Sequence, residues 1–332
     1  MTGRTANEGA FSSMTMIAVF PGQGAQAVGM GRALYESSPA ARAVFDEVDE
    51  ALGEPLSALI FEGAPDRLTL TANAQPALMA TSLAAVRAVE ERIGRRLATL
   101  VAYVAGHSLG EHSALAAAGA ISVGDAARLL RLRGQAMQDA VAAGEGAMAA
   151  ILGADVLMVE AVVAEAAAAG GVCALANDNG EGQQVISGTA AAVERAVALA
   201  KERGARRSVM LQVSAPFHCA LMQPAADRLA DALANVALMP PAVPVIANVT
   251  AEPVQDVAAI RDLLIRQVTA RVRWRESMAT MVRLGVDGVV EFGAGKVLTG
   301  LAKRGVPGAA LHNVQEPADV EALAVQLAGS AA

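Results

Sequence analysis

Short apolar runs alternate along this chain with longer stretches in which apolar residues recur every three or four positions. Residues 16–20 are uniformly apolar and stop at a Pro-Gly pair, which predicts a short buried strand. Apolar residues at every fourth position from 44 to 52 predict a helix over 39–52, with Ser38 as its N-cap. The same reasoning predicts helices over 73–93, 109–118 and 124–142, and strands over 100–105, 243–248 and 286–291. This alternation is typical of an α/β protein with a mostly parallel sheet.

The pattern changes between residues 144 and 212. It predicts, in order, strand 147–151, helix 155–169 capped by Asp155, strands 172–177 and 184–187, helix 190–203 and strand 208–211. That order is the one of a ferredoxin-like α+β module. We therefore expect a large α/β domain over 15–143 and 213–332, an inserted ferredoxin-like subdomain over 144–212, and a disordered extension over 1–14.

Composition excludes several function classes. The net charge of −7 argues against nucleic acid as the main partner, because phosphate binding needs a basic face. No uncharged apolar run reaches the length that crosses a bilayer, so we expect no membrane association. The two cysteines, Cys173 and Cys219, show no metal-ligand spacing, which suits a reducing cytoplasm.

The chemistry starts from Gly106-His107-Ser108-Leu109-Gly110, a G-x-S-x-G sequence between a predicted strand and a predicted helix that ends at Gly119. Glycines on both sides permit the sharp turn that exposes a serine hydroxyl. The helix N-terminus would point free N–H groups at the group that Ser108 attacks. We interpret Ser108 as a nucleophile; a glycine-rich turn without chemistry is the alternative.

A serine nucleophile needs a base, and the chain has four histidines. His107 and His112 flank the serine, but side chains beside such a serine usually point away from it. His312 lies near the C-terminus. His218 follows a predicted strand in a turn-like segment and is the favoured base, although a structural role for this histidine stays open.

Five segments resemble, in order and spacing, the motifs of malonyl-CoA:acyl carrier protein transacylases over about residues 16–314. They are Phe20–Gln26, Gly106–Glu111, Arg131–Gln138, Ala215–Cys219 and Phe292–Leu298. The resemblance is to the free-standing bacterial enzymes of fatty acid synthesis more than to polyketide synthase domains. It implies a large α/β-hydrolase-like domain with the ferredoxin-like insertion, and no metal or redox cofactor.

The resemblance also implies roles for single residues. Ser108 would carry the acyl group and His218 would take its proton, oriented by the backbone carbonyl of Gln267 rather than by a carboxylate. The backbone N–H groups of Gln23 and Leu109 would form the oxyanion hole, as a glycine-rich turn and a helix N-terminus can.

The same resemblance assigns four residues to substrate binding. Arg133 would hold the free carboxylate of malonate, since a planar guanidinium meets a carboxylate with two charge-assisted bonds; an ordinary arginine on an amphipathic helix is the alternative. Phe217 would exclude α-branched substrates, or be a plain core residue. Asn179 and Gln183 would border the substrate entrance, but Gly180-Glu181-Gly182 stands where the family often has proline, and simple loop polarity is an equal interpretation.

The implied function is a ping-pong transfer of malonyl from malonyl-CoA to acyl carrier protein by a monomer. Because carrier proteins of such systems are acidic, a basic patch should border the cleft. Its candidates are Arg203, Arg206, Arg207, Arg271, Arg273 and Arg275, each of which could equally lie on a solvated face. Alternatives are a transacylase of a polyketide synthase or malonate decarboxylase system, a patatin-like serine hydrolase using Asp287-Gly288, and a non-catalytic scaffold that binds carrier protein.

Overall fold

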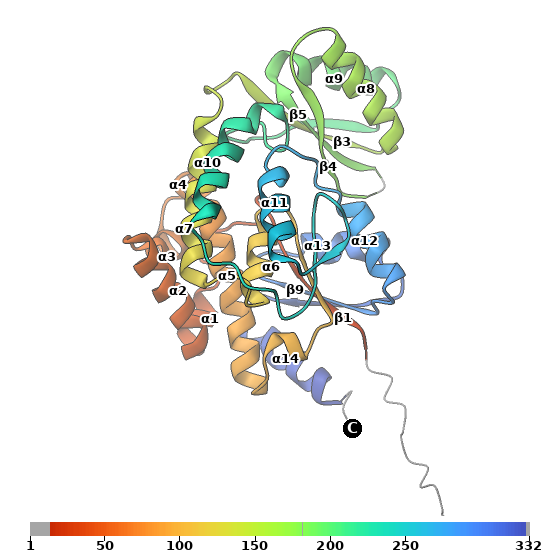
Figure 1. Ribbon diagram of the computed structural model, residues 1–332. Helices are drawn as coiled ribbons and strands as arrows, with labels where there is room; N and C mark the ends of the chain where they lie inside the picture. The colour runs from red at the N-terminus through yellow and green to blue at the C-terminus, as the bar shows by residue number, and fades with distance from the viewer. Residues whose placement is uncertain (1–13, 181, 330–332) are drawn as a thin grey trace, which may run out of the picture.

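Two sheets organise the molecule, a large one beneath and a small one above in the view of Figure 1. The computed structural model describes residues 14–180 and 182–329. The disordered extension predicted over 1–14 lies outside these residues, apart from Met14. Within the described residues, no helix combines the length and the apolar character that a bilayer crossing requires.

The large sheet has six strands in the order β10-β9-β1-β2-β7-β8. All neighbouring pairs are parallel except β7 with β8. This confirms the mostly parallel sheet predicted from the sequence. The strands are β1 (Met16–Phe20), β2 (Tyr103–Gly106), β7 (Val245–Ile246), β8 (Pro253–Val254), β9 (Gly288–Phe292) and β10 (Ala310–Val314).

Helices cover both faces of this sheet, which explains why β1 is apolar throughout. Ala18 and Phe20 pack into one core cluster, whereas Ile17 and Val19 pack into a second cluster with Trp274. The helices of this domain are α1 (Arg32–Ser37), α2 (Pro39–Leu52), α3 (Leu56–Glu62), α4 (Pro65–Thr69), α5 (Thr71–Ile93), α6 (Gly110–Ala117), α7 (Val123–Asp139), α10 (Gln223–Ala234), α11 (Val257–Gln267), α12 (Trp274–Arg283), α13 (Val297–Gly305) and α14 (Pro317–Gly329).

Several predicted boundaries shift for local reasons. The strand expected over 100–105 begins only at Tyr103, because Leu97–Thr99 form a 3₁₀ turn that delays it. The strand expected over 243–248 shrinks to β7, since the N–H of Ala247 turns to the carbonyl of Glu252 and starts the reversal into β8. The Ser38 cap is confirmed: its hydroxyl accepts from the N–H of Ala41.

The small sheet has the order β4-β5-β3-β6 and is antiparallel throughout. Its elements follow the chain as β3 (Gly146–Leu152), α8 (Val156–Ala168), β4 (Cys173–Asp178), β5 (Gln183–Thr189), α9 (Ala190–Glu202) and β6 (Arg207–Met210). This is the predicted ferredoxin-like order, and Asp155 caps α8 as expected by accepting from the N–H of Met158. The exact boundaries at 144 and 212 stay a prediction.

The end of β4 is joined directly to the large domain. The N–H of Asp178 donates to the carbonyl of Val272 at 3.0 Å, and the N–H of Val272 donates to the carbonyl of Ala176 at 2.8 Å. The guanidinium of Arg275 pairs with the buried carboxylate of Asp178 at 2.8 Å. These contacts fix one edge of the small sheet above the carboxyl ends of β1 and β2.

Candidate active site

Ser108 lies in the sharp turn between β2 and α6, with a φ of +52° that a non-glycine residue rarely adopts. The two flanking glycines are required by close packing. A Cβ at Gly106 would meet the carbonyl oxygen of Gly110 at 1.8 Å, and a Cβ at Gly110 would meet the carbonyl oxygen of Phe20 at 2.2 Å. The sequence-predicted elbow is therefore present, and it raises the serine hydroxyl at the carboxyl edge of the sheet.

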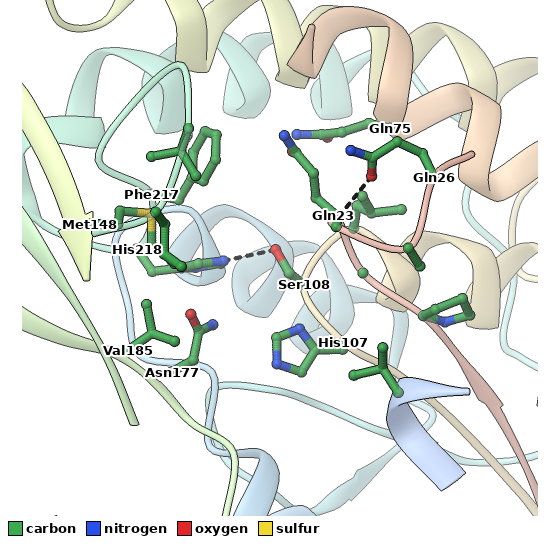
Figure 2. Close-up of a pocket in the computed structure, with 18 of the residues that line it drawn as sticks. Gln23, Gln26, Gln75, His107, Ser108, Met148, Asn177, Val185, Phe217 and His218 are labelled. Carbon is green, nitrogen blue, oxygen red and sulfur yellow. Dashed lines mark hydrogen bonds between the residues drawn. The ribbon is translucent and has the colours of Figure 1, made fainter. Parts of the chain in front are cut away.

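His218 faces the serine. Its Nε2 lies 2.7 Å from the Oγ of Ser108 (Figure 2). Its Nδ1 lies 2.9 Å from the backbone carbonyl oxygen of Gln267. Because a carbonyl only accepts, Nδ1 carries the proton and Nε2 is left to accept from the hydroxyl. Burial, with the nearby charge of Arg133, lowers the pKa of His218 to about 3, so the ring is neutral and able to act as a base.

Arg133 brings a buried cation to the same hydroxyl. Its side chain, from α7, is 1% exposed, and Nη2 lies 3.3 Å from the Oγ of Ser108. Nη1 donates to the Oε1 of Gln75 at 2.8 Å and Nη2 to the Oε1 of Gln267 at 3.0 Å. Burial lowers the pKa of Arg133 to about 10, which leaves it charged at neutral pH. A cation beside the nucleophile is suited to an anionic substrate group.

A buried polar network lies beneath the elbow. The backbone N–H of Ser108 donates to the Oδ1 of Asn248 at 2.7 Å, and the Nδ2 of Asn248 donates to the carbonyl of Gly106 at 2.7 Å. The Nε2 of Gln267 donates to the carbonyl of Ser108 at 2.9 Å and to the Oε2 of Glu111 at 2.8 Å. Each side of the turn is thus held by side chains from other elements.

A cavity of about 400 Å³ opens above Ser108 between the two sheets. Figure 2 shows Met148, Val185 and Phe217 on the side of His218, and Gln23 and Gln26 on the other side. The walls near His218 are thus apolar. The volume is sufficient for a small acyl group beside Ser108.

Of the two residues expected at the substrate entrance, one lines the cavity and the other does not. Asn179 lines the cavity, and its Oδ1 lies 2.7 Å from the Nε2 of His107. Gln183 does not line it; its backbone closes a turn with Asn179 and Gly180 at the start of β5. Glu181 lies outside the described residues.

Gln23 and Leu109 both line the cavity with Ser108. Among the described residues, neither backbone N–H has a hydrogen-bond partner. Two unpaired amides beside a nucleophile are the donors that an oxyanion hole requires.

The profile of the family described as "Acyl transferase domain" matches residues 17–323. The chain belongs to this acyltransferase family. A malonyl CoA-acyl carrier protein transacylase of Bacillus subtilis (strain 168) is 49% identical over 286 residues, which cover 86% of this chain and 89% of the relative.

Solved structures of the same kind superpose closely. An acyl-carrier-protein-S-malonyltransferase from Bartonella henselae is 53% identical, with a TM-score of 0.92 over 95% of this chain and 100% of that one. A malonyl-transacylase in complex with its holo type II PKS acyl-carrier protein is 40% identical, with a TM-score of 0.90 over 94% of this chain and 99% of that one. These similarities confirm the family resemblance stated from the motifs.

Other residues considered from the sequence lie away from this candidate site. Asp287 precedes β9 and bonds to the backbone of Thr15 and Ala310, at the sheet edge opposite to Ser108. His112 is buried in α6 with no partner on either ring nitrogen within the described part of the chain. The side chain of His312, on the edge strand β10, contacts Gln326. The described residues contain no cluster of three or more side chains suited to hold a metal ion.

The expected basic patch is largely neutralised. Arg203 pairs with Glu165, Arg271 with Glu160, Arg273 with Glu276 and Arg275 with Asp178. Arg206 and Arg207 are exposed, and neither has a carboxylate partner among the residues that the structure describes. The free positive charge of this set is therefore confined to the approach to β6.

Three buried polar residues of this candidate site are not predicted from the sequence. Gln75 interrupts an apolar run in α5, Glu111 follows the elbow in an alanine-rich helix, and Asn248 lies two residues after the end of β7. Each carried a signal, because a lone polar residue in an apolar pattern is buried only when it is bonded. The signal marks burial and does not identify the partner.

Proposed function

We propose that this protein transfers the malonyl group from malonyl-CoA to the phosphopantetheine thiol of acyl carrier protein. The observation that carries the proposal is the buried Arg133 guanidinium 3.3 Å from a serine that is bonded to a neutral histidine. A hydrolase of neutral acyl groups has no use for that cation. The names of the relatives support the same donor and acceptor.

In the proposed reaction, Ser108 attacks the thioester carbonyl while His218 takes the hydroxyl proton at Nε2. The N–H groups of Gln23 and Leu109 stabilise the negative oxygen of the tetrahedral intermediate. The C–S bond then breaks, and the CoA sulfur leaves with the proton from His218. The thiol of the carrier protein repeats these steps on malonyl-Ser108 in the opposite direction.

Substrate recognition is proposed for the residues around this centre. Arg133 holds the malonyl carboxylate, Phe217 restricts the space beside the α-carbon, and Asn179 borders the entrance. The carbonyl of Gln267 keeps the proton of His218 on Nδ1. Gln183 contributes only through the backbone turn that positions Asn179.

The wider setting is proposed from the family. The enzyme supplies fatty acid biosynthesis in the cytoplasm, as a monomer and without a metal or redox cofactor. Because one of the similar structures is a complex with a type II PKS acyl-carrier protein, a role in a polyketide pathway is the alternative. The large domain is taken as 15–143 with 213–332 and the small one as 144–212. Arg206 and Arg207 are the remaining candidates for contact with the acidic carrier protein.

Intact-protein mass spectrometry after brief mixing with malonyl-CoA tests the proposal, with acetyl-CoA in a parallel sample. We expect a malonyl adduct that is lost in Ser108→Ala, and little acetyl adduct. Equal adducts from both donors would show that Arg133 does not select the malonyl group. Steady release of CoA without any adduct would indicate hydrolysis and overturn the transfer.

A further inference from the structure

Glu111 is a buried carboxylate that the reaction does not use. It lies in the first turn of α6 and is 3% exposed. Its Oε2 accepts the N–H of Asn248 at 3.1 Å and the Nε2 of Gln267 at 2.8 Å. Among the described residues, Arg133 donates to Gln75, Ser108 and Gln267 and forms no ion pair with Glu111. A buried carboxylate without a direct cation partner needs another explanation.

The Gln267 amide connects Glu111 to Arg133. Its Nε2 donates to Glu111 and to the carbonyl of Ser108, and its Oε1 accepts from Nη2 of Arg133 at 3.0 Å. An amide can lie in two orientations that differ by a half turn and exchange donor with acceptor. The Nε2 of Gln267 also lies 3.4 Å from the Oδ1 of Asn248, so the reversed orientation would set oxygen against three acceptors and an NH₂ group against a guanidinium.

We propose that Glu111 is a positioning residue that sets the dicarboxylate selectivity of the site by fixing the orientation of the Gln267 amide. The ionised carboxylate is acceptor-only, so it requires the NH₂ group of Gln267 and sends the amide oxygen to Arg133. Arg133 is thereby aimed at Ser108 without being neutralised by a direct ion pair. The inference rests on the proposed malonyl transfer.

Protonation of Glu111 should change the substrate selectivity if the residue has this role. Burial raises the pKa of Glu111 to about 7, opposed by the bonds from Asn248 and Gln267 and by the charge of Arg133. Once protonated, the carboxyl loses its charge and can also donate, so it holds the amide less strongly and leaves this orientation to the carbonyl of Ser108 and the guanidinium of Arg133. The other charged or titratable groups facing the site do not interfere: the pKa values of His112 and His218 lie at about 3, that of Arg133 at about 10, and burial lowers that of His107.

The experiment measures single-turnover acylation of the full chain by malonyl-CoA and by acetyl-CoA between pH 6 and pH 8. In the unmodified protein we expect the malonyl-to-acetyl rate ratio to rise with pH through about 7, the pKa of Glu111. In Glu111→Gln the pH dependence should disappear. In Glu111→Leu, which removes the acceptor, the ratio should fall by about tenfold or more, the effect of one misaligned charge-assisted bond.

Two further variants separate positioning from general damage. Gln267→Leu removes the amide but keeps the carbonyl that holds His218, so it should lower the ratio as Glu111→Leu does. The double variant should add little to either single change, because both act through one contact. Glu291→Gln is the matched control: it also neutralises a buried glutamate, which caps α13 and has no bond to Gln267.

The outcomes are distinct. A ratio that is unchanged in both Glu111→Leu and Gln267→Leu, or rates that fall equally for both donors, would overturn the role of Glu111. If Glu111→Leu does not fold, the pH profile of Glu111→Gln decides, and a retained rise would also overturn it. An unmodified protein that forms no malonyl adduct would overturn the proposed function itself.

Discussion

Replacing Arg133 by alanine tests whether the buried cation selects the substrate. A guanidinium has five N–H groups, and three of them point at Gln75, Gln267 and Ser108. Nε has no partner within the described part of the chain, and one hydrogen of Nη1 is unassigned. Because these two hydrogens point in different directions, a bidentate contact with a carboxylate pairs one of them with an Nη2–H that is released from Ser108.

The magnitude follows from that count. Each hydrogen bond to a charged group contributes about 1.5–3 kcal/mol, so the pair contributes about 3–6 kcal/mol. At a factor of ten for each 1.4 kcal/mol, Arg133→Ala should lower the malonyl-to-acetyl acylation ratio by about 10²–10⁴. The guanidinium is already desolvated in this fold, so little of the gain is spent on removing its water.

The assay is rapid-quench acylation with either donor, followed by intact mass. Arg133→Lys is the matched control: it keeps a charge but loses the planar fork, so it should recover only part of the ratio. Because Arg133 helps to lower the pKa of His218, the alanine variant should also shift the acidic limb of acetyl transfer to higher pH. Rates that drop by one common factor for both donors would refute the reasoning.

Three further predictions concern other parts of the molecule. Gly106→Ala should prevent elbow formation and abolish acylation, since its Cβ would lie 1.8 Å from the carbonyl oxygen of Gly110; an active, well-folded variant seen by circular dichroism would contradict this. His112→Leu should stabilise the protein more at pH 5 than at pH 8. Burial lowers the pKa of His112 from 6.5 to about 3, so below pH 6.5 the unfolded chain binds a proton on this ring and the folded protein does not. This difference lowers the free energy of unfolding by about 2 kcal/mol at pH 5. Urea unfolding that gives equal gains at both pH values would count against it. Phe217→Val should raise acylation by methylmalonyl-CoA relative to malonyl-CoA by roughly tenfold, the value of one methyl group in a tight pocket; an unchanged ratio would place the restriction elsewhere.

The sequence predicted the local features of this fold better than the contacts between distant segments. The elbow at Ser108 was recognised because its glycines, strand and helix are neighbours in the chain. The ferredoxin-like insertion was recognised because the order of its elements is itself a pattern. Strand ends were misplaced where a 3₁₀ turn or a reversal competed with an apolar run, as before Tyr103 and after Ile246.

The residues of the candidate site could not all be predicted from the pattern of apolar and polar residues. The place of His218 in a turn-like segment after a predicted strand favours it as the base, whereas its partner Gln267 came from the family resemblance. Gln75, Glu111 and Asn248 were not predicted, since α5, α6 and the segment after β7 meet only in three dimensions. The arginine pairs show the same limit, because the sequence gives the charges but not which glutamate lies opposite each one.

The bonds that join Val272 to Ala176 and to Asp178 have a consequence for how substrate size can change during evolution. They are main-chain bonds, so a substitution removes one of them only where it introduces proline, and they hold the small sheet at a set height over Ser108. The spacing between the two domains is therefore difficult to alter by point mutation. The cavity can be enlarged or reduced instead at Met148, Val185 and Phe217, whose side chains form its wall. Related enzymes with larger substrates would then keep the same backbone frame and differ at these three positions.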